Sequence, residues 1–250
     1  MLIWQLFGCH IPQDGYNNKM KPFPFTIGYI DKSMTFQTFV GGESNGMAKA
    51  AAMAVSEKPG GEYNPFYVYG GRGVGKTHLL NAIANELGQK GNDVQICRMA
   101  EISTNKLNPG NPPAAIIIDD FMLPNSGAET TILDLYAKGV QIVLSGSEPP
   151  EKLPDTPLSE LIKKQGKSAD IGRPEEELRI AILKARADDE KMSLPDDAAR
   201  FIANHIGGNT TLLLGALKRV RAHSSLAGQE ISKFSAVESL KDYIWKTKED

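Results

Sequence analysis

Short apolar runs, each bounded by glycine, proline or polar residues, predict buried β-strands in the first half of the chain. They span residues 65–69, 93–99, 114–120 and 139–145. Runs of this length that are rich in β-branched residues are typical of strands buried on both faces. Because stretches with a helical pattern separate them, we expect a parallel, doubly wound sheet. After Pro149 and Pro150 no further strong strand is predicted.

Helices are predicted where apolar residues recur three or four positions apart. The predicted helices cover residues 47–55, 78–87, 129–138 and 174–185, and further helices begin near Pro195, at Asn209 and near Ser235. Three glutamates at 175–177 are expected to form a solvated helix start. The pattern predicts an undefined N-terminal extension (1–33), an α/β core (34–172) and a small all-helical domain (173–250).

Composition narrows the class of protein. The 250 residues are 41% hydrophobic and 23% charged, which is ordinary for a globular protein. No transmembrane run and no signal peptide are predicted. The two cysteines, Cys9 and Cys97, lie far apart in the sequence and fit no disulfide framework and no cysteine-ligated metal centre, so we expect a protein of the reducing cytoplasm. The net charge of −2 provides no global electrostatic case for binding nucleic acid.

Residues 70–77 read Gly-Gly-Arg-Gly-Val-Gly-Lys-Thr and match the phosphate-binding pattern GxxxxGK[ST]. They lie between a predicted strand and a predicted helix, which is the context that this pattern requires. Glycines allow a tight turn whose backbone N–H groups surround an anion, and the following helix adds the positive end of its dipole. The predicted nucleotide-binding residues here are Gly71, Gly73, Val74, Gly75, Lys76, Thr77 and His78. Lys76 would reach the terminal phosphates and Thr77 would bind Mg²⁺, whereas a structural part is expected for His78.

Two carboxylates, Asp119 and Asp120, end the predicted strand at 114–120. A carboxylate at this place can bind the hydration shell of a Mg²⁺ ion held at a phosphate loop. We assign that part to Asp119. Asp120 is the best candidate for activating a water molecule, or it holds Asp119 in place.

Together these segments resemble the AAA+ ATPase domain of the bacterial replication initiator family DnaA. The resemblance is carried by residues 35–45, 63–80, 117–120, 142–150 and 195–217, and it is most specific over 34–80. It implies an α/β fold, a P-loop AAA+ core with a parallel five-stranded sheet, followed by a small all-helical lid domain. It also implies a bound ATP or ADP with Mg²⁺. Phe39, Val40 and Asn45 would then lie near the adenine.

Departures from the family pattern lower the expected rate of hydrolysis. The family's arginine finger should fall within residues 158–164, which contain Lys163 and Lys164 but no arginine, and we expect a solvated basic turn there. The two sensor positions, usually an acid and an arginine, fall on Ser147 and Thr211. Because an arginine finger contributes about 10³–10⁵ in rate, we expect nucleotide binding with weak or no hydrolysis.

The parts with which the family contacts DNA are not predicted. The sequence ends at Asp250 without a helix-turn-helix pattern, and the connection at 100–113 is short, with Lys106 its only basic residue. A basic cluster at 218–223 could contact DNA phosphates, but basic residues at a helix C-terminus also suit the helix dipole, and we favour that interpretation. This DnaA/Hda-like pattern indicates a replication regulator whose partners are proteins such as DnaA or the sliding clamp, or further copies of itself. A clamp-binding peptide is faintly similar to Gln5-Leu6-Phe7.

Two other functions stay open. A DNA-acting ATPase, such as a helicase loader or a transposition regulator, would need a basic strip and ATP-dependent assembly. A small-molecule P-loop kinase would need a lid rich in arginine, whereas residues 151–173 contain mostly lysine as basic residues.

Overall fold

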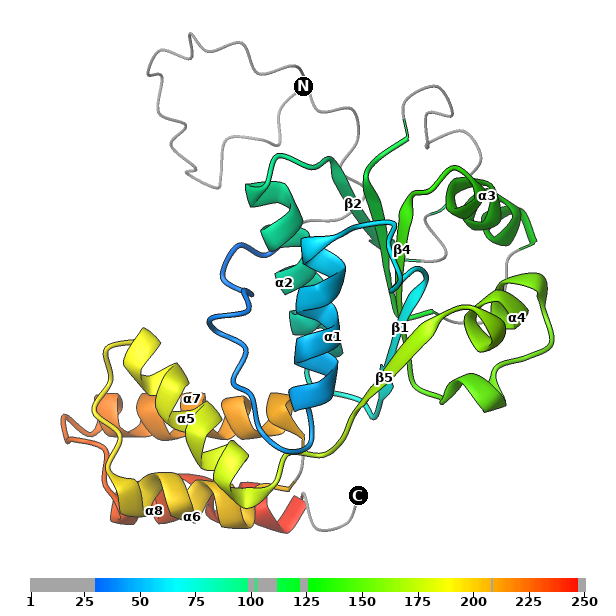
Figure 1. Cartoon of the computed structure of the whole chain (residues 1–250). Helices are drawn as coiled ribbons and strands as arrows, with labels where there is room; N and C mark the ends of the chain where they lie inside the picture. The colour runs from blue at the N-terminus through cyan, green and yellow to red at the C-terminus, as the bar shows by residue number, and fades with distance from the viewer. Residues whose placement is uncertain (1–29, 99–101, 103–111, 122–125, 208, 247–250) are drawn as a thin grey trace, which may run out of the picture.

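The computed structural model describes residues 30–98, 102, 112–121, 126–207 and 209–246 (Figure 1). The predictions made for Gln5-Leu6-Phe7, for Cys9 and for the connection around Lys106 lie outside the described residues.

Five parallel strands form one sheet in the order β2-β3-β4-β1-β5. The strands are β1 (Phe66–Gly70), β2 (Val94–Arg98), β3 (Ala115–Asp119), β4 (Gln141–Gly146) and β5 (Lys167–Ile171). The first four confirm the strands predicted from apolar runs. The P-loop core with a five-stranded parallel sheet is confirmed as well.

The fifth strand corrects the expectation that no strand follows Pro149 and Pro150. β5 pairs with β1 from Phe66 opposite Lys167 to Gly70 opposite Ile171. Of its five residues only Ile171 is buried, so the strand has no apolar run to reveal it. Its position is set by backbone pairing at the edge of the sheet, which a hydrophobic pattern does not report.

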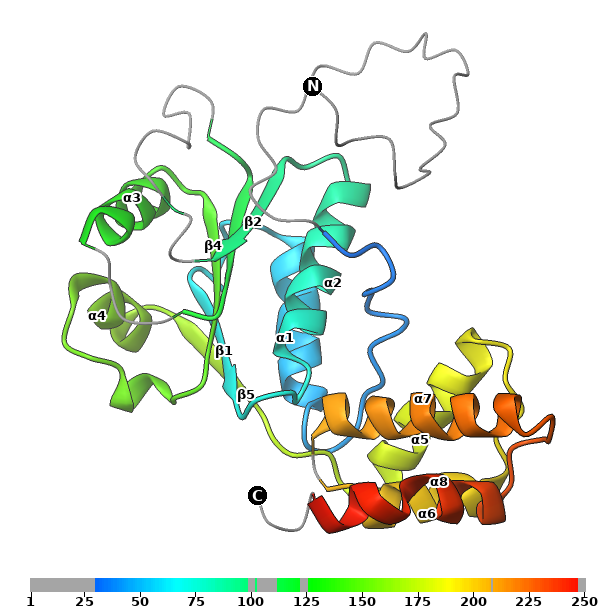
Figure 2. The same cartoon turned by 180° about the vertical axis from the view of Figure 1, so that it is seen from behind.

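Helices cover both faces of the sheet (Figures 1 and 2). They are α1 (Gly46–Glu57), α2 (Lys76–Gln89), α3 (Ser126–Ala137) and α4 (Pro157–Lys164), with a short 3₁₀ helix η2 (Pro150–Lys152). Ile117 of β3 joins the apolar cluster under α1 and α2. Its neighbours Ile116 and Ile118 point the other way and join the cluster under α3 and α4. This alternation buries β3 on both faces.

Four further helices pack together beside the α1 and α2 side of the core (Figure 2). They are α5 (Glu176–Asp189), α6 (Asp196–His205), α7 (Thr210–Leu226) and α8 (Lys233–Lys246). A third apolar cluster holds them together, with Leu183, Ile202, Leu217 and Leu240 among its buried members. We call α5 to α8 the lid. In the part of the chain that the structure describes, no helix is long and apolar enough to cross a membrane.

The segment between β5 and α5 attaches the lid to the loop before α1. The Gly172 amide donates to the Ser44 carbonyl at 2.9 Å, and the Glu43 amide donates to Glu175 Oε1 at 3.0 Å. Burial alone would raise the pKa of Glu175, but hydrogen bonds from surrounding backbone amides hold this pKa below its usual value. The solvated helix start predicted at 175–177 is therefore wrong for Glu175, because its carboxylate is an acceptor for the core.

Candidate nucleotide-binding site

The loop at 70–77 joins the end of β1 to the start of α2 and turns through backbone conformations that suit glycine. Gly73 has φ +74°, and Gly75, the residue before the helix, has φ +117°. Side chains strongly disfavour these angles. The turn therefore exposes backbone amides at the N-terminus of α2, which is the arrangement that binds an anion.

Lys76 is held over this loop. Its Nζ donates to the carbonyls of Gly70 and Gly71, each at 2.8 Å. Burial lowers the pKa of Lys76 from its usual value, while the charges of Asp119 and Asp120 act against that shift. The ammonium group thus lies at the loop and feels the charge of the two carboxylates, where the terminal phosphates of a nucleotide would need a cation.

Two hydroxyl groups fix the Asp119 carboxylate. Thr77 Oγ1 donates to Asp119 Oδ2, and Ser145 Oγ donates to Asp119 Oδ1, both at 2.7 Å. The Thr77 hydroxyl and the Asp119 carboxylate are hard oxygen donors of the kind that Mg²⁺ prefers. The chemistry of this pair therefore fits the predicted metal-binding role of Thr77 and Asp119.

Sequence reasoning missed Ser145, which shapes this corner of the site. Ser145 is fully buried at the carboxyl end of β4, next to β3 in the sheet. Its Oγ accepts from the Asp120 amide at 2.9 Å, and its carbonyl accepts from the Phe121 amide at 2.6 Å. Carboxyl ends of neighbouring parallel strands meet at one edge, so a polar residue ending the next predicted strand was the available signal.

Asp120 adopts φ +60°, which is uncommon for a residue with a side chain. The hydrogen bonds that the Asp120 and Phe121 amides donate to Ser145 hold the backbone in this turn. Its side chain borders the same cavity as Lys76 and Thr77. The catalytic role assigned to Asp120 stays a prediction.

Two cavities meet at the loop, and residues of the core and the lid line both of them. The first, of about 740 Å³, is lined by Gly73, Gly75, Lys76, Thr77, Asp119, Asp120, Ser145, Ser147 and Thr211, among others. The second, of about 620 Å³, is lined by Phe39, Val40, Asn45, Val74, Ile182, Arg186 and Lys218, among others. They share Met34, Gly75, His78, Thr210 and Leu214. Together they form one joined site, in which the first cavity contains the phosphate loop and the two carboxylates and the second contains Phe39 and Val40.

The segment before α1 forms one wall of the second cavity. The Asn45 amide holds it, since Nδ2 donates to the Val40 carbonyl at 3.0 Å and Oδ1 accepts from the Gly42 amide at 2.8 Å. Lys49 Nζ donates to the Phe39 carbonyl at 2.7 Å. Of the residues predicted for the whole site, Gly71 alone lines neither cavity, and its carbonyl accepts a hydrogen bond from Lys76. Contact of these residues with a nucleotide remains a prediction.

His78 ties this wall to α2. Its Nε2 lies 3.2 Å from both the Thr35 carbonyl and Thr38 Oγ1, and its ring meets the edge of Phe39 with centroids 5.3 Å apart. Burial lowers the pKa of His78, while the Thr35 carbonyl and Asp31 act against the shift and Lys49 adds to it. These contacts support the structural part expected for His78.

Because the pKa of His78 is lowered on folding, we expect acid to destabilise the chain through this residue. The unfolded chain takes up a proton near the ordinary value of 6.5, whereas the folded chain does so only at lower pH. The stability that the neutral His78 side chain contributes to the fold is thus complete above pH 6.5 and is lost as the pH falls towards the folded pKa. The loss amounts to about 1.4 kcal/mol for each pH unit that separates the unfolded pKa from the folded pKa.

Urea unfolding of the wild type and of His78→Asn at several values between pH 7.5 and pH 5 would measure this effect. The pKa of Asp31 is lowered from 3.8, so Asp31 titrates below that window. The wild type should lose more stability than the variant on acidification. Parallel curves for the two proteins would contradict the assignment.

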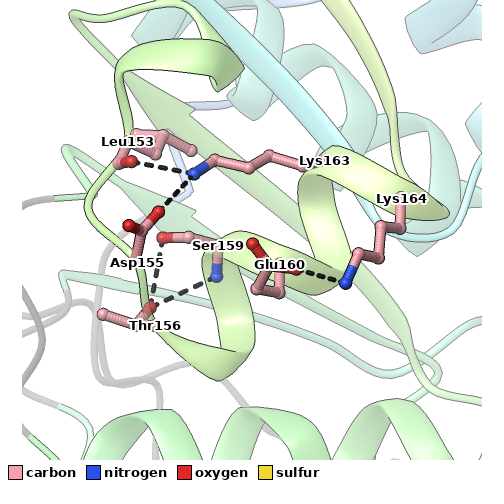
Figure 3. Close-up of polar contacts among 7 residues, drawn as sticks. All are labelled: Leu153, Asp155, Thr156, Ser159, Glu160, Lys163 and Lys164. Carbon is pink, nitrogen blue, oxygen red and sulfur yellow. Dashed lines mark hydrogen bonds and ion pairs between the residues drawn. The ribbon is translucent and has the colours of Figure 1, made fainter.

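The segment at 158–164 is not the solvated basic turn that we expected (Figure 3). It forms helix α4, which begins with Pro157 after the N-cap Thr156, whose side chain accepts from the Ser159 amide. Lys163 is largely covered, because its Nζ donates to the Leu153 carbonyl and to Asp155 Oδ1, each at 3.1 Å (Figure 3). The signal missed in the sequence was Thr156 followed by Pro157, because threonine caps helices and proline favours the first helical position.

Lys164 is paired with Glu160 on the exposed side of α4 (Figure 3). Neither Lys163 nor Lys164 is among the described residues that line the two cavities. Within the chain, these lysines therefore bind their own helix and the preceding loop rather than the proposed phosphate site.

The basic cluster at 218–223 separates in the structure. Arg219 Nε donates to the Ser239 carbonyl of α8 at 2.7 Å, and Arg221 pairs with Glu190. Lys218 instead lines the second cavity. The cluster thus joins lid helices and borders the site, and this was not evident from the sequence.

Comparison of the sequence with known proteins identifies similar ATPase domains. Residues 30–107 match the family model described as the bacterial DnaA ATPase domain. The chromosomal replication initiator protein DnaA of Enterococcus faecalis is 36% identical over 234 residues, which are 85% of this chain and 52% of that protein. The chain spans about half the length of the curated relatives it matches.

Solved structures show the same fold. Domain III of the replication initiation protein DnaA from Thermotoga maritima matches with a TM-score of 0.75 and 28% identity, over 87% of this chain and 99% of that one. A structure of the replication initiator DnaA bound to AMPPCP and single-stranded DNA matches with a TM-score of 0.70 and 22% identity, over 86% and 70%.

Proposed function

We propose that this chain, which carries an AAA+ ATPase domain of the DnaA family, binds ATP or ADP in the joined cavities between its core and its lid. The observation that carries the proposal is the meeting of Lys76, Thr77 and Asp119 at one cavity that the lid residue Thr211 also lines. The phosphates would lie on the loop and the base in the cavity beside Phe39.

The relatives support an adenine nucleotide as the ligand. One structural neighbour, a DnaA protein, was solved with AMPPCP, which is an ATP analogue. Thr77 and Asp119 would hold Mg²⁺ here, and the ion would neutralise charge on the phosphates. Lys76 and the loop amides would orient the phosphates, and Asp120 would hold a water molecule near them.

We propose further that hydrolysis by this chain alone is weak. The cavity contains Ser147 and Thr211 where the family places an acidic residue and an arginine. The lysines of α4 bind Asp155 and Glu160 and are absent from the described cavity walls. The chain then acts as a nucleotide-dependent binding module in the cytoplasm more than as a fast ATPase.

Replacing Thr211 by arginine should restore a cation at the phosphate end of the site. We expect ATP to bind about tenfold more tightly relative to ADP, because one charge-assisted hydrogen bond contributes about 1.5–3 kcal/mol. Single-turnover hydrolysis of ATP should accelerate as well. Leu212→Arg is the matched control, since it adds the same charge one residue along and Leu212 lines neither described cavity. Equal effects of both variants would contradict the assignment.

The biological role that we propose is in replication initiation or its regulation, through contacts with DnaA-type initiators, the sliding clamp or further copies of this chain. The relatives of this domain are named as chromosomal replication initiators. Affinity capture with ATP or ADP present, using the wild type and Lys76→Ala as baits, would test the role. Replication proteins should be recovered with the wild type and not with the variant. Identical recovery with both baits would argue against a nucleotide-dependent partner.

A DNA-acting ATPase is the second candidate, because one structural neighbour was solved with single-stranded DNA. It predicts ATP-dependent DNA binding that weakens steeply with salt. Nucleotide binding without DNA binding at moderate salt would favour the first proposal.

A further inference from the structure

The lid holds the outside of the phosphate loop through two neighbouring carbonyl groups. Asn209 Nδ2 donates to the Arg72 carbonyl, and the Thr210 amide donates to the Gly73 carbonyl, both at 3.0 Å. The approach is so close that a Cβ built at Gly73 would overlap the Asn209 side-chain amide. Gly73 is thus needed both for its positive φ and for the contact with the lid.

These two contacts set the direction of the loop's amides. In a trans peptide the C=O and the following N–H point in opposite directions. The Arg72 carbonyl shares a peptide plane with the Gly73 amide, and the Gly73 carbonyl shares one with the Val74 amide. Because the lid binds both carbonyls, both N–H groups face away from Asn209. Within the described part of the chain neither amide donates a hydrogen bond to the backbone, so both are available to a ligand.

One side chain performs two tasks at this place. Asn209 is the N-cap of α7, and its Oδ1 accepts from the amides of Thr211 at 2.9 Å and Leu212 at 3.3 Å. Serine, threonine and aspartate cap helices as well. Asparagine differs from them because its amide also carries N–H donors beside the capping oxygen. The capping bonds explain why residue 209 has a side-chain oxygen acceptor, and the bond to the Arg72 carbonyl explains why that side chain is an amide.

We propose that Asn209 is a positioning residue for nucleotide binding, although it belongs to the lid and needs no contact with the nucleotide. Its side-chain amide orients the Arg72–Gly73 peptide plane, and the backbone amide of the next residue, Thr210, orients the Gly73–Val74 plane, so that both N–H groups receive phosphate oxygens. Movement of the lid then changes the affinity of the loop for phosphate. The inference rests on the proposed function, because it concerns the same phosphate site.

The test separates the capping task from the orienting task. Asn209→Ser keeps a capping oxygen but loses the amide donor, and Asn209→Ala loses both. Thr156→Ala is the control, since it removes a side-chain cap from α4, whose residues lie outside the described cavity walls. Affinity for ADP and for inorganic tripolyphosphate, which has no base, would be measured beside the thermal midpoint of each protein.

Both Asn209 variants should bind ADP and tripolyphosphate about five- to tenfold more weakly, the effect of one lost hydrogen bond. Asn209→Ser should melt close to the wild type, whereas Asn209→Ala and Thr156→Ala should melt lower. Thr156→Ala should keep full affinity. Wild-type affinity in Asn209→Ser would overturn the inference and leave the proposed function intact. If the wild type binds neither probe, the proposed function is wrong and the inference is wrong with it.

Discussion

Replacing Lys76 by alanine should lower the affinity of the chain for ADP and ATP by at least about 100-fold, because charge-assisted hydrogen bonds contribute about 1.5–3 kcal/mol each and Lys76 would make more than one. The ammonium group is held over the loop by the Gly70 and Gly71 carbonyls. Its removal leaves the phosphates facing Asp119 and Asp120 with one cation fewer. Calorimetric titration would measure the loss.

Lys90→Ala is the matched control for this experiment. It removes the same charge at the other end of α2, where Lys90 pairs with Glu86 and donates to the Ser56 carbonyl. We expect it to leave the affinity unchanged. Both variants should retain the wild-type circular dichroism spectrum, so that a loss of binding reports the site. Wild-type affinity in Lys76→Ala would disprove the assignment of the phosphate loop.

Truncation of Leu80 to alanine should cost about 3–4 kcal/mol of unfolding free energy, within the range measured for buried Leu→Ala changes. Leu80 is fully buried in the apolar cluster between α1, α2 and the sheet. The removed atoms leave a cavity that close-packed neighbours fill only in part. Since α2 continues directly from the phosphate loop, the same packing anchors Lys76 and Thr77. Denaturant unfolding would measure the change.

Leu226→Ala is the matched control, because it makes the same substitution at an exposed position. Leu226 is 90% exposed at the end of α7, so Leu226→Ala should change the unfolding free energy by less than about 0.5 kcal/mol. A comparable cost for both variants would show that the cluster beneath α2 does not carry the stability of the core.

The parts of the site that could be predicted from the sequence are those whose residues are consecutive in the chain. The loop at 70–77 and the Asp119-Asp120 pair are recognisable because strand, turn and helix signals lie beside each other in the chain. The resemblance to the DnaA family added Phe39, Val40 and Asn45, which do line the second cavity. Local chemistry and family pattern thus located the walls of the site.

The parts that were missed depend on contacts between distant segments. β5 is defined by pairing with β1, about 100 residues earlier, and only Ile171 in it is buried. The role of the Ser145 hydroxyl follows from its hydrogen bond to Asp119, which belongs to the neighbouring strand. Asn209 could be read as a helix cap, but its bond to the Arg72 carbonyl requires the packing of lid against core. Hydrophobic periodicity contains no information on such pairings.

Calorimetric titration of the wild-type chain with ADP and with GDP, in the presence of Mg²⁺, tests most directly whether the joined cavities hold an adenine nucleotide. We expect ADP to saturate one site per chain, GDP to bind more weakly, and chelation of Mg²⁺ to reduce the affinity for ADP. No detectable binding of ADP, or equal binding of the two nucleotides, would contradict the account.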